Sequence, residues 1–329
     1  MKIRAGNRQN TTRITLMLFV ALFCLVGRAS AQDISAHNHV TSPTNLNEEA
    51  IQDWAKQKLA KSPRHSEWVK VKNGTREVNS FVVYPESNKK ATAVVVIHEI
   101  FGMSDWVQQL TDELAEAGYI AIAPDLLSGM GPNGGGTSSF DANGVRQAIG
   151  ALPPDQITAD LNAVADYVSK LPGANGKVAV TGYCWGGSQS FRFATNRPTL
   201  KAAFVFYGSA PGSNAQGQAY APDKAALGKI GAPVYGFYAE NDMRIDATIP
   251  PTSDAMKELK KPYDAVTYAG AGHGFMRAGE PNSPEPKAAA TDADEAAAKK
   301  AASDLAMYKA NRKARDDAWV RWKAILAKL

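Results

Sequence analysis

The sequence has few cysteines, few long apolar runs and little excess charge. It holds two Cys in 329 residues, which is too few for a disulfide framework. Its longest apolar run, Ile14 to Val26, is shorter than the about 20 residues that a helix needs to cross a bilayer. We find no internal repeat. These absences exclude a disulfide-stapled scaffold, a multispan membrane protein and a repeat protein.

The first 31 residues predict an export signal. Basic residues without an acidic one precede the apolar run, and Ala29-Ser30-Ala31 provides the small residues of a cleavage site. A membrane anchor is an alternative, but the run is short for one. Lipid attachment at Cys24 is disfavoured because bulky Phe23 precedes it. We therefore expect cleavage after Ala31 and a periplasmic or secreted protein.

Removing this leader changes the charge and the cysteine count. The whole chain has 37 Lys+Arg and 32 Asp+Glu, and the leader holds five of the basic residues and none of the acidic ones. The remaining 32 of each sign give no reason to expect a nucleic-acid partner or stable membrane insertion. Cys184 is then the only thiol. A lone thiol in an oxidising compartment is a liability unless it is buried or useful.

The rest of the chain predicts one large α/β domain with extensions. Residues 32–66 are polar and form an N-terminal extension, with a helix expected at 45–62. From residue 67 to residue 329, strands alternate with helices, which predicts a mostly parallel sheet covered by helices on both faces. An exposed insertion is expected at about 279–302, and one or two terminal helices at 301–329.

The expected strands share β-branched or continuous apolar residues. They are Trp68–Val71 and Phe81–Tyr84, paired as a hairpin, and then Ala93–Ile97, Tyr119–Ala123, Val178–Thr181, Ala202–Tyr207, Val234–Tyr238 and Ala265–Tyr268. Helices are expected at 104–117 and 155–171. The Gly-rich stretch 126–144 lacks the Lys-Ser/Thr of a phosphate-binding loop, so we interpret it as a flexible lid or surface loop.

The most informative stretch is Val178 to Ser188, in which a strand runs into Gly182-Tyr-Cys184-Trp-Gly186. This is the pattern of a nucleophile elbow, with Cys in the place of the usual Ser. Gly on both sides leaves room for neighbouring backbone. The positive end of the following helix favours a thiolate at Cys184. The alternative is a Gly-rich turn with a buried structural Cys.

Three further side chains follow the ends of predicted strands. Glu99 follows Ala93–Ile97, Asp242 follows Val234–Tyr238, and His273 follows Ala265–Tyr268. The carboxyl ends of parallel strands meet at one edge of the sheet, and the order nucleophile, acid, base is that of α/β-hydrolases. His can activate a thiol, and a carboxylate can orient His. Singly, Asp242 is also a plausible cap and His273 a surface residue.

The joint motifs resemble those of the dienelactone hydrolase (carboxymethylenebutenolidase) family. The matching stretches are His98-Glu-Ile-Phe-Gly102, Gly182-Tyr-Cys-Trp-Gly-Gly187, Phe206-Tyr-Gly208, Asn241-Asp242, Gly272-His-Gly-Phe-Met-Arg277 and Ala314-Arg-Asp-Asp-Ala-Trp319. The resemblance covers about residues 66–329. The signal, the extension and the insertion depart from the small cytoplasmic form of the family, and His98 replaces the residue expected before Glu99.

The resemblance implies the α/β-hydrolase fold and a site without metal or organic cofactor. It implies Cys184 as nucleophile, His273 as base and Asp242 as its orienting acid. It further implies that Glu99 meets the resting thiol and that the backbone N–H groups of Ile100 and Trp185 form the oxyanion hole. The substrate carboxylate would meet Arg277, with Arg146 as the nearest candidate for a second arginine. Two alternatives remain: Glu99 forms an ion pair with an arginine such as Arg146 or Arg277, or Arg277 is a surface residue paired with Glu280.

We therefore expect a hydrolase of lactones or activated esters, whose partner is a small-molecule substrate that can carry a carboxylate. A broad esterase or thioesterase with the same triad is one alternative. A non-catalytic binding protein of the same fold is another, which the complete triad disfavours. His37 and His39 lie near the new N-terminus without an acidic or Cys partner nearby, so we expect no metal site there.

Overall fold

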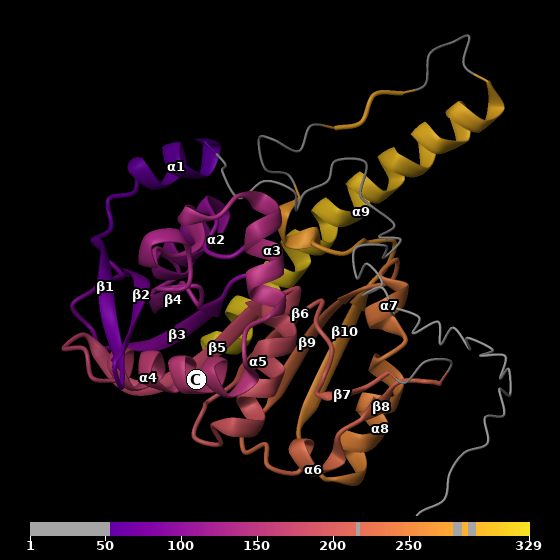
Figure 1. The fold of residues 1–329 in the computed structure, drawn as a ribbon. Coiled ribbons are helices and arrows are strands. Elements are labelled where there is room, and N and C mark those ends of the chain that lie inside the picture. The colour runs from indigo at the N-terminus through magenta and orange to yellow at the C-terminus, as the bar shows by residue number, and fades with distance from the viewer. Residues whose placement is uncertain (1–52, 215–217, 279–284, 289–293) are drawn as a thin grey trace, which may run out of the picture. The chain divides into compact units, whose positions relative to one another are not determined.

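The computed structural model describes residues 53–214, 218–278, 285–288 and 294–329 (Figure 1). All of them belong to one compact unit, His39–Leu329. The predicted export signal, both His37 and His39, and most of the predicted 32–66 extension lie outside the described residues. Of the helix expected at 45–62, the structure describes α1, Asp53–Ala60.

A single large sheet organises the described residues. Its strands are β1 (Ser66–Asn73), β2 (Arg76–Val83), β3 (Ala91–Ile97), β4 (Ile120–Pro124), β5 (Ala174–Tyr183), β6 (Ala203–Phe206), β9 (Val234–Ala239) and β10 (Tyr263–Tyr268). Their order is β1-β2-β4-β3-β5-β6-β9-β10. Strand β2 is antiparallel to both β1 and β4, and the other neighbouring strands are parallel. The predicted mostly parallel sheet is therefore confirmed. A separate two-stranded ladder pairs β7 (Gly212–Ser213) with β8 (Ala221–Pro222).

Strand β3 shows why the central strands read as continuous apolar runs. All seven of its residues are buried. Its side chains alternate between the two faces, so that Val94 and Val96 join one apolar cluster while Val95 and Ile97 join the other. A parallel strand covered on both faces needs apolar residues at every position.

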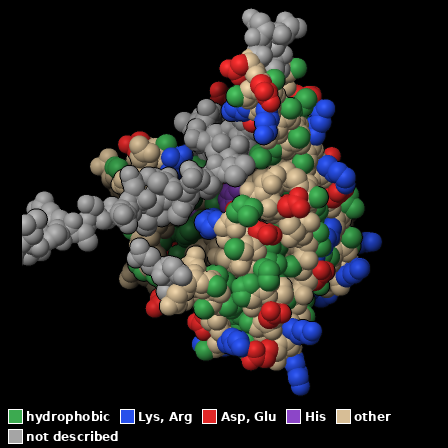
Figure 2. Space-filling view, turned by 90° about the vertical axis from the view of Figure 1, so that its right-hand side faces the viewer, with side chains coloured by type: hydrophobic (Ala, Val, Ile, Leu, Met, Phe, Trp, Pro, Cys, Tyr) green, Lys and Arg blue, Asp and Glu red, His purple; other side chains and the backbone are tan. Residues whose placement is uncertain are grey.

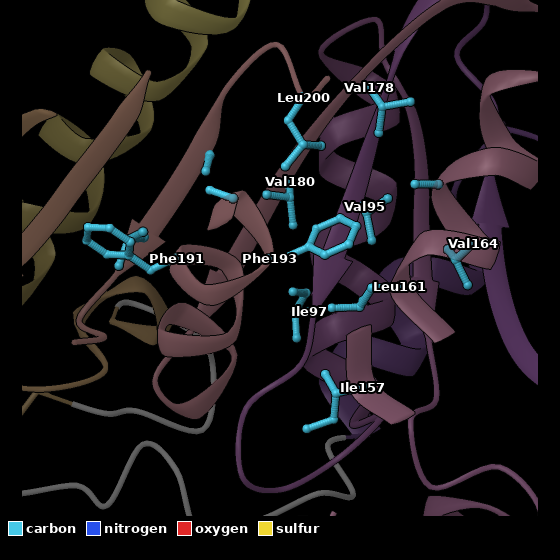
Figure 3. Close-up of a cluster of buried hydrophobic side chains, with 14 of the residues drawn as sticks. Val95, Ile97, Ile157, Leu161, Val164, Val178, Val180, Phe191, Phe193 and Leu200 are labelled. Atoms are coloured by element: carbon cyan, nitrogen blue, oxygen red, sulfur yellow. The ribbon is translucent and has the colours of Figure 1, made fainter. Parts of the chain in front are cut away.

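Helices cover each face of this sheet. They are α2 (Asp105–Glu116), α3 (Ala142–Gly150), α4 (Pro154–Ser169), α5 (Trp185–Asn196), α6 (Lys224–Leu227), α7 (Met243–Asp246), α8 (Ile249–Glu258) and α9 (Glu295–Leu326). Side chains of α4 and α5, among them Leu161 and Phe193, pack with Val95 and Val180 on one face (Figure 3). Trp106 of α2 and Trp322 of α9 belong to the cluster on the other face.

Helix α9 begins earlier than the sequence predicted. We expected an exposed insertion to residue 302 and a terminal helix from residue 301, whereas the helix starts at Glu295. The Asp294 side chain caps it by accepting the N–H of Ala297. The Ala-rich stretch that follows has high helix propensity and remains exposed, so burial was not needed to form it.

The Gly-rich loop after β4 is anchored at its middle. The Asp125 carboxylate accepts bonds from the N–H and the hydroxyl of Thr137, at 2.8 and 2.7 Å. The same hydroxyl oxygen accepts the N–H of Met103 at 3.1 Å. The loop contains two 3-10 turns, Pro132–Gly134 and Thr137–Ser139, and α3 follows it. This loop is therefore fastened next to the end of β3.

Within the described ranges, no helix combines the length and the apolar character needed to cross a membrane. Figure 2 shows Lys, Arg, Asp and Glu side chains interspersed on the face in view, without a field of one sign. Nor do the residues described include a group of three or more His, Cys, Asp or Glu arranged to hold a metal ion.

Candidate active site

The candidate side chains lie just beyond the carboxyl ends of neighbouring strands. Glu99 follows β3, Cys184 follows β5, Asp242 follows β9 and His273 follows β10. Strand β6, between β5 and β9, is followed by Tyr207. Ligands of open α/β sheets bind at this edge. The structure thus brings the predicted residues to the edge where chemistry is expected.

Cys184 occupies a sharp turn between β5 and α5. Its φ and ψ are 55° and −118°, which is a strained conformation for a residue with a side chain. The flanking glycines are required for packing. A Cβ on Gly182 would overlap the carbonyl oxygen of Gly186, and one on Gly186 would overlap that of His98. The backbone therefore has the geometry that the sequence pattern of a nucleophile elbow predicted.

His273 contacts both residues that the sequence placed with it. Its Nδ1 hydrogen-bonds with the Asp242 carboxylate, and its ring also interacts with the Cys184 side chain. Burial alone would lower the pKa of His273, but the charge of the Cys184 sulfur and the bond to Asp242 raise this pKa to about 10. The ring and the carboxylate are each less than a tenth exposed. A histidine in contact with both a thiol and a carboxylate is suited to covalent catalysis.

Two asparagines to which the sequence analysis gave no role fix the loop that carries His273: Asn241 joins it to the loop of Asp242, and Asn311 joins it to α9. The side chain of Asn241 donates to the Gly270 carbonyl at 2.9 Å, and its N–H donates to the Ala271 carbonyl at 2.8 Å. The Gly272 N–H donates to the Asn311 side-chain oxygen at 2.7 Å. Asn311 lies on α9, 38 positions past His273, and no local pattern in the sequence marks it.

Glu99 pairs with Arg277, as in the alternative interpretation of the sequence, whereas the resemblance implied a contact with the thiol. Its carboxylate lies 3.1 Å from Nε of Arg277 and accepts a bond from the Tyr207 hydroxyl at 3.4 Å. No hydrogen bond joins it to Cys184 in the part of the chain that the structure describes. Burial and the charge of Glu99 raise the pKa of Tyr207 well above its usual value, so the phenol stays a donor. Glu99 therefore belongs to a buried ion pair at the same edge of the sheet as Cys184.

The two arginines predicted to bind substrate differ in how far they are exposed. Arg277 is 2% exposed, and its guanidinium carbon lies 4.6 Å from the centre of the Trp106 ring. Arg146, on α3, is half-buried, and its guanidinium carbon lies 5.1 Å from the centre of the Phe101 ring. Arg277 lies 5.9 Å from the same ring. Both arginines therefore flank Phe101, and Arg146 is the more accessible of the two.

The backbone amides of Ile100 and Trp185 are available as donors. Among the described residues, neither N–H has a backbone or side-chain acceptor. Trp185 is the first residue of α5, where an amide has no partner within its helix. The two residues belong to touching turns, because the backbone of His98 lies against Gly186. Such a pair of free amides fits a developing oxyanion.

Fold and site geometry place the chain among the α/β-hydrolases. The sequence profile of the dienelactone hydrolase family matches residues 78–328, and the chain belongs to this family. It is a hydrolase that acts on carboxylic esters or lactones.

Relatives agree with this assignment, and solved structures share the fold. A "Putative carboxymethylenebutenolidase" of Yersinia pestis is 30% identical over 205 residues, covering 60% of this chain and 74% of the relative. A relative of the same description from Escherichia coli K12 is 30% identical over 192 residues, covering 58% and 69%. A dienelactone hydrolase-like promiscuous phosphotriesterase from metagenomic libraries has the same fold, with a TM-score of 0.57 at 20% identity over 81% of this chain and 98% of that one.

Proposed function

We propose that the protein hydrolyses a lactone or an activated carboxylic ester through Cys184, His273 and Asp242. The observation that supports this most is the position of His273. Its ring interacts with the Cys184 sulfur and, through Nδ1, with the Asp242 carboxylate, at the carboxyl edge of the sheet. This is the arrangement in which a thiol is activated and a histidine is held in one tautomer.

In the first half of the reaction, the Cys184 sulfur attacks the carbonyl carbon. The carbonyl oxygen becomes an oxyanion that accepts the N–H groups of Ile100 and Trp185. The intermediate then collapses, the C–O bond of the ester breaks, and the imidazolium of His273 gives its proton to the leaving oxygen. The acyl group remains on Cys184 as a thioester. With a lactone, the released hydroxyl stays on the same molecule.

In the second half, neutral His273 takes a proton from water, and the resulting hydroxide attacks the thioester carbonyl. The same amides hold the second oxyanion. Collapse expels the Cys184 thiolate, releases the carboxylic acid and restores the ion pair with His273. Asp242 keeps Nδ1 protonated throughout, so Nε2 is the nitrogen that exchanges protons with substrate and water.

The substrate class depends on which arginine is accessible. Arg277 is buried against Glu99 and Trp106, so Arg146 is the better candidate for binding an anionic group on the substrate. This supports a lactone that bears a carboxylate. Arg277 is already paired with Glu99, so its charge is less available to an anionic substrate. This equally favours a second candidate, a broader esterase or thioesterase with the same three residues and little preference for anions.

Replacing the nucleophile tests the proposal. We expect Cys184→Ala to lower kcat for nitrophenyl esters and small lactones by about a million-fold, as in serine-type triads. The matched control is Cys184→Ser, which replaces the thiol with a hydroxyl nucleophile at the elbow and should retain more activity than the Ala variant. Circular dichroism would establish that each variant is folded. Turnover by Cys184→Ala within tenfold of the parent rate would remove Cys184 from the mechanism.

We also propose that the protein is exported, with residues 1–31 removed. The basic start, the apolar run and Ala29-Ser30-Ala31 support this. Expression of the full chain in a Gram-negative bacterium, fractionation and N-terminal sequencing would test it. We expect a periplasmic or secreted product that begins at Gln32. A product in the cytoplasm that retains residues 1–31 would contradict the proposal.

A further inference from the structure

His98 is a buried histidine next to the candidate site that the reaction scheme does not use. Its side chain is completely buried, one residue beyond the end of β3. Its Nε2 lies 3.3 Å from the Leu126 nitrogen, which can only donate, so Nε2 is an acceptor. Its Nδ1 lies 2.8 Å from the Glu99 carbonyl oxygen, which can only accept, so Nδ1 carries the proton. These two bonds define one neutral tautomer.

The surroundings of the ring favour this neutral form. Burial lowers the pKa of His98, although the nearby Asp125 carboxylate opposes this shift. Asp125 itself is engaged by the Leu127 N–H and by Thr137. The loop that supplies the Leu126 N–H is thus fastened, and it holds the His98 ring from one side.

The acceptor of the His98 proton belongs to the peptide bond that carries the Ile100 N–H. The Glu99 carbonyl and the Ile100 amide are the two ends of one planar trans peptide, so their C=O and N–H bonds point in opposite directions. The same carbonyl also accepts the Gly102 N–H at 3.1 Å. Two donors therefore clamp one end of the peptide, and this fixes the direction in which the Ile100 N–H points. A hydrogen-bonded carbonyl also polarises its amide, which strengthens the N–H as a donor.

His98 also contacts the residue that provides the second amide. Its ring is stacked on the Trp185 ring, with 5.6 Å between the ring centres and 12° between the planes. Its backbone carbonyl lies against Gly186, where a Cβ would overlap it. One side chain therefore touches the turns that carry both Ile100 and Trp185.

We propose that His98 is a positioning residue of the oxyanion hole: its Nδ1–H orients the Glu99–Ile100 peptide, and its ring braces Trp185. This inference rests on the proposed function, because it assumes that the Ile100 and Trp185 amides bind the oxyanion. His98 touches no reacting atom and exchanges no proton during turnover.

Three substitutions separate the two hydrogen bonds of the ring. His98→Asn places an amide nitrogen near the position of Nδ1, so it keeps the donor to Glu99. His98→Gln places its amide near the position of Nε2, so it keeps the partner of Leu126 and loses the donor to Glu99. His98→Phe keeps a ring beside Trp185 and loses both bonds. Asn and Gln are close to His in polarity and size, so the comparison holds even where the Phe variant does not fold.

Turnover of nitrophenyl acetate is the first measurement. Loss of an oxyanion donor costs about 100- to 1,000-fold in kcat, and a misdirected donor should cost less, about 10- to 100-fold. We expect that loss for His98→Gln and His98→Phe with KM changed by about twofold or less, since the oxyanion forms only in the reaction. His98→Asn should remain within about fivefold of the parent kcat, because it retains the donor.

The rate of alkylation by iodoacetamide is the second measurement. This reaction uses the Cys184 sulfur but forms no oxyanion on a bound ester, so it should be unchanged in all three variants. Equal kcat losses in the Asn and Gln variants, or alkylation that slows together with turnover, would overturn the role of His98. Cys184→Ala is assayed alongside. If the proposed function is wrong, turnover persists in Cys184→Ala. If only the role of His98 is wrong, turnover is lost in Cys184→Ala as expected.

Discussion

The Glu99 carboxylate lies 3.1 Å from Nε of Arg277, and both side chains are at most 2% exposed. The guanidinium also stacks on Trp106, and its Nη2 donates to the Ser104 hydroxyl at 3.4 Å. Removing one member of a buried ion pair leaves a charge in a medium that solvates it poorly. Arg277 therefore supports the folded state, in addition to any contact with substrate.

Replacement of Arg277 should reveal this support. We expect Arg277→Met to lower the free energy of unfolding by about 3–5 kcal/mol, the usual cost of breaking a buried pair. Adding Glu99→Gln to the same chain should recover most of the loss, because no buried charge then remains. Urea unfolding of the parent, the two single variants and the double variant measures both effects. A single Arg277→Met variant as stable as the parent would show that the pair contributes little.

Arg146 should act on binding of anionic substrates. Its guanidinium is half-buried over Phe101 and has no carboxylate partner among the described residues. We expect Arg146→Met to raise KM about tenfold for a lactone that carries a carboxylate, since losing one charge-assisted hydrogen bond costs about 1.5–3 kcal/mol. KM for a neutral ester of similar size should not change. Equal changes for both substrates would favour the broader esterase.

Much of the fold was predictable because the sheet imposes simple patterns on the sequence. Strands such as β3 and β6 are buried on both faces and read as continuous apolar runs. The hairpin of β1 and β2 is marked by Gly74, whose φ is 60°. Helix α2 begins after Ser104, whose side chain accepts the Val107 N–H at 3.3 Å. Each of these features depends on neighbouring residues, so the sequence shows it locally.

The remaining features depend on contacts between distant segments. The Glu99–Arg277 pair and the bond of Asn311 to Gly272 join residues far apart in the chain. Tyr207 has a φ of 39° and touches both Glu99 and His273, and its motif Phe206-Tyr-Gly208 gives no sign of these contacts. The sequence analysis named Arg146 and Arg277 as possible partners of Glu99, but only the packing shows that Arg277 is the partner and that the Tyr207 hydroxyl joins it. Helix α9 was predicted too short because its first turns rest on propensity, with no apolar stripe to mark them.

Asn311 should be needed to hold the loop before His273. It is 1% exposed and accepts the Gly272 N–H at 2.7 Å. Asn311→Leu would leave that N–H without this acceptor, at a cost of about 1–3 kcal/mol. We expect a lower unfolding free energy and a lower kcat. Asn311→Asp keeps an acceptor of the same length and should retain more activity. Full activity in the Leu variant would show that the loop holds its position without α9.

The pKa of His273 should determine the alkaline limit of the reaction. The proposed first half-reaction needs a protonated His273 to give its proton to the leaving oxygen. The pKa is raised to about 10, so the protonated form persists below that pH and is lost above it. An unperturbed histidine, with a pKa of about 6.5, would already have lost its proton at neutral pH. Asp242 is one of the groups that raise the pKa, so Asp242→Asn should move this limit to lower pH.

We therefore expect kcat/KM for an alkyl ester to be constant from neutral pH and to fall above about pH 10. The measurement covers pH 6 to 11, after subtraction of spontaneous hydrolysis. A nitrophenyl ester is the matched control, because nitrophenolate leaves without a proton and its profile should fall less. Asp242→Asn should lower kcat by orders of magnitude, through loss of the correct tautomer, and shift the alkaline limb for the alkyl ester downward. An alkaline limb near pH 6.5–7 in the parent enzyme would mean that Cys184 and Asp242 do not hold the proton on His273 during turnover.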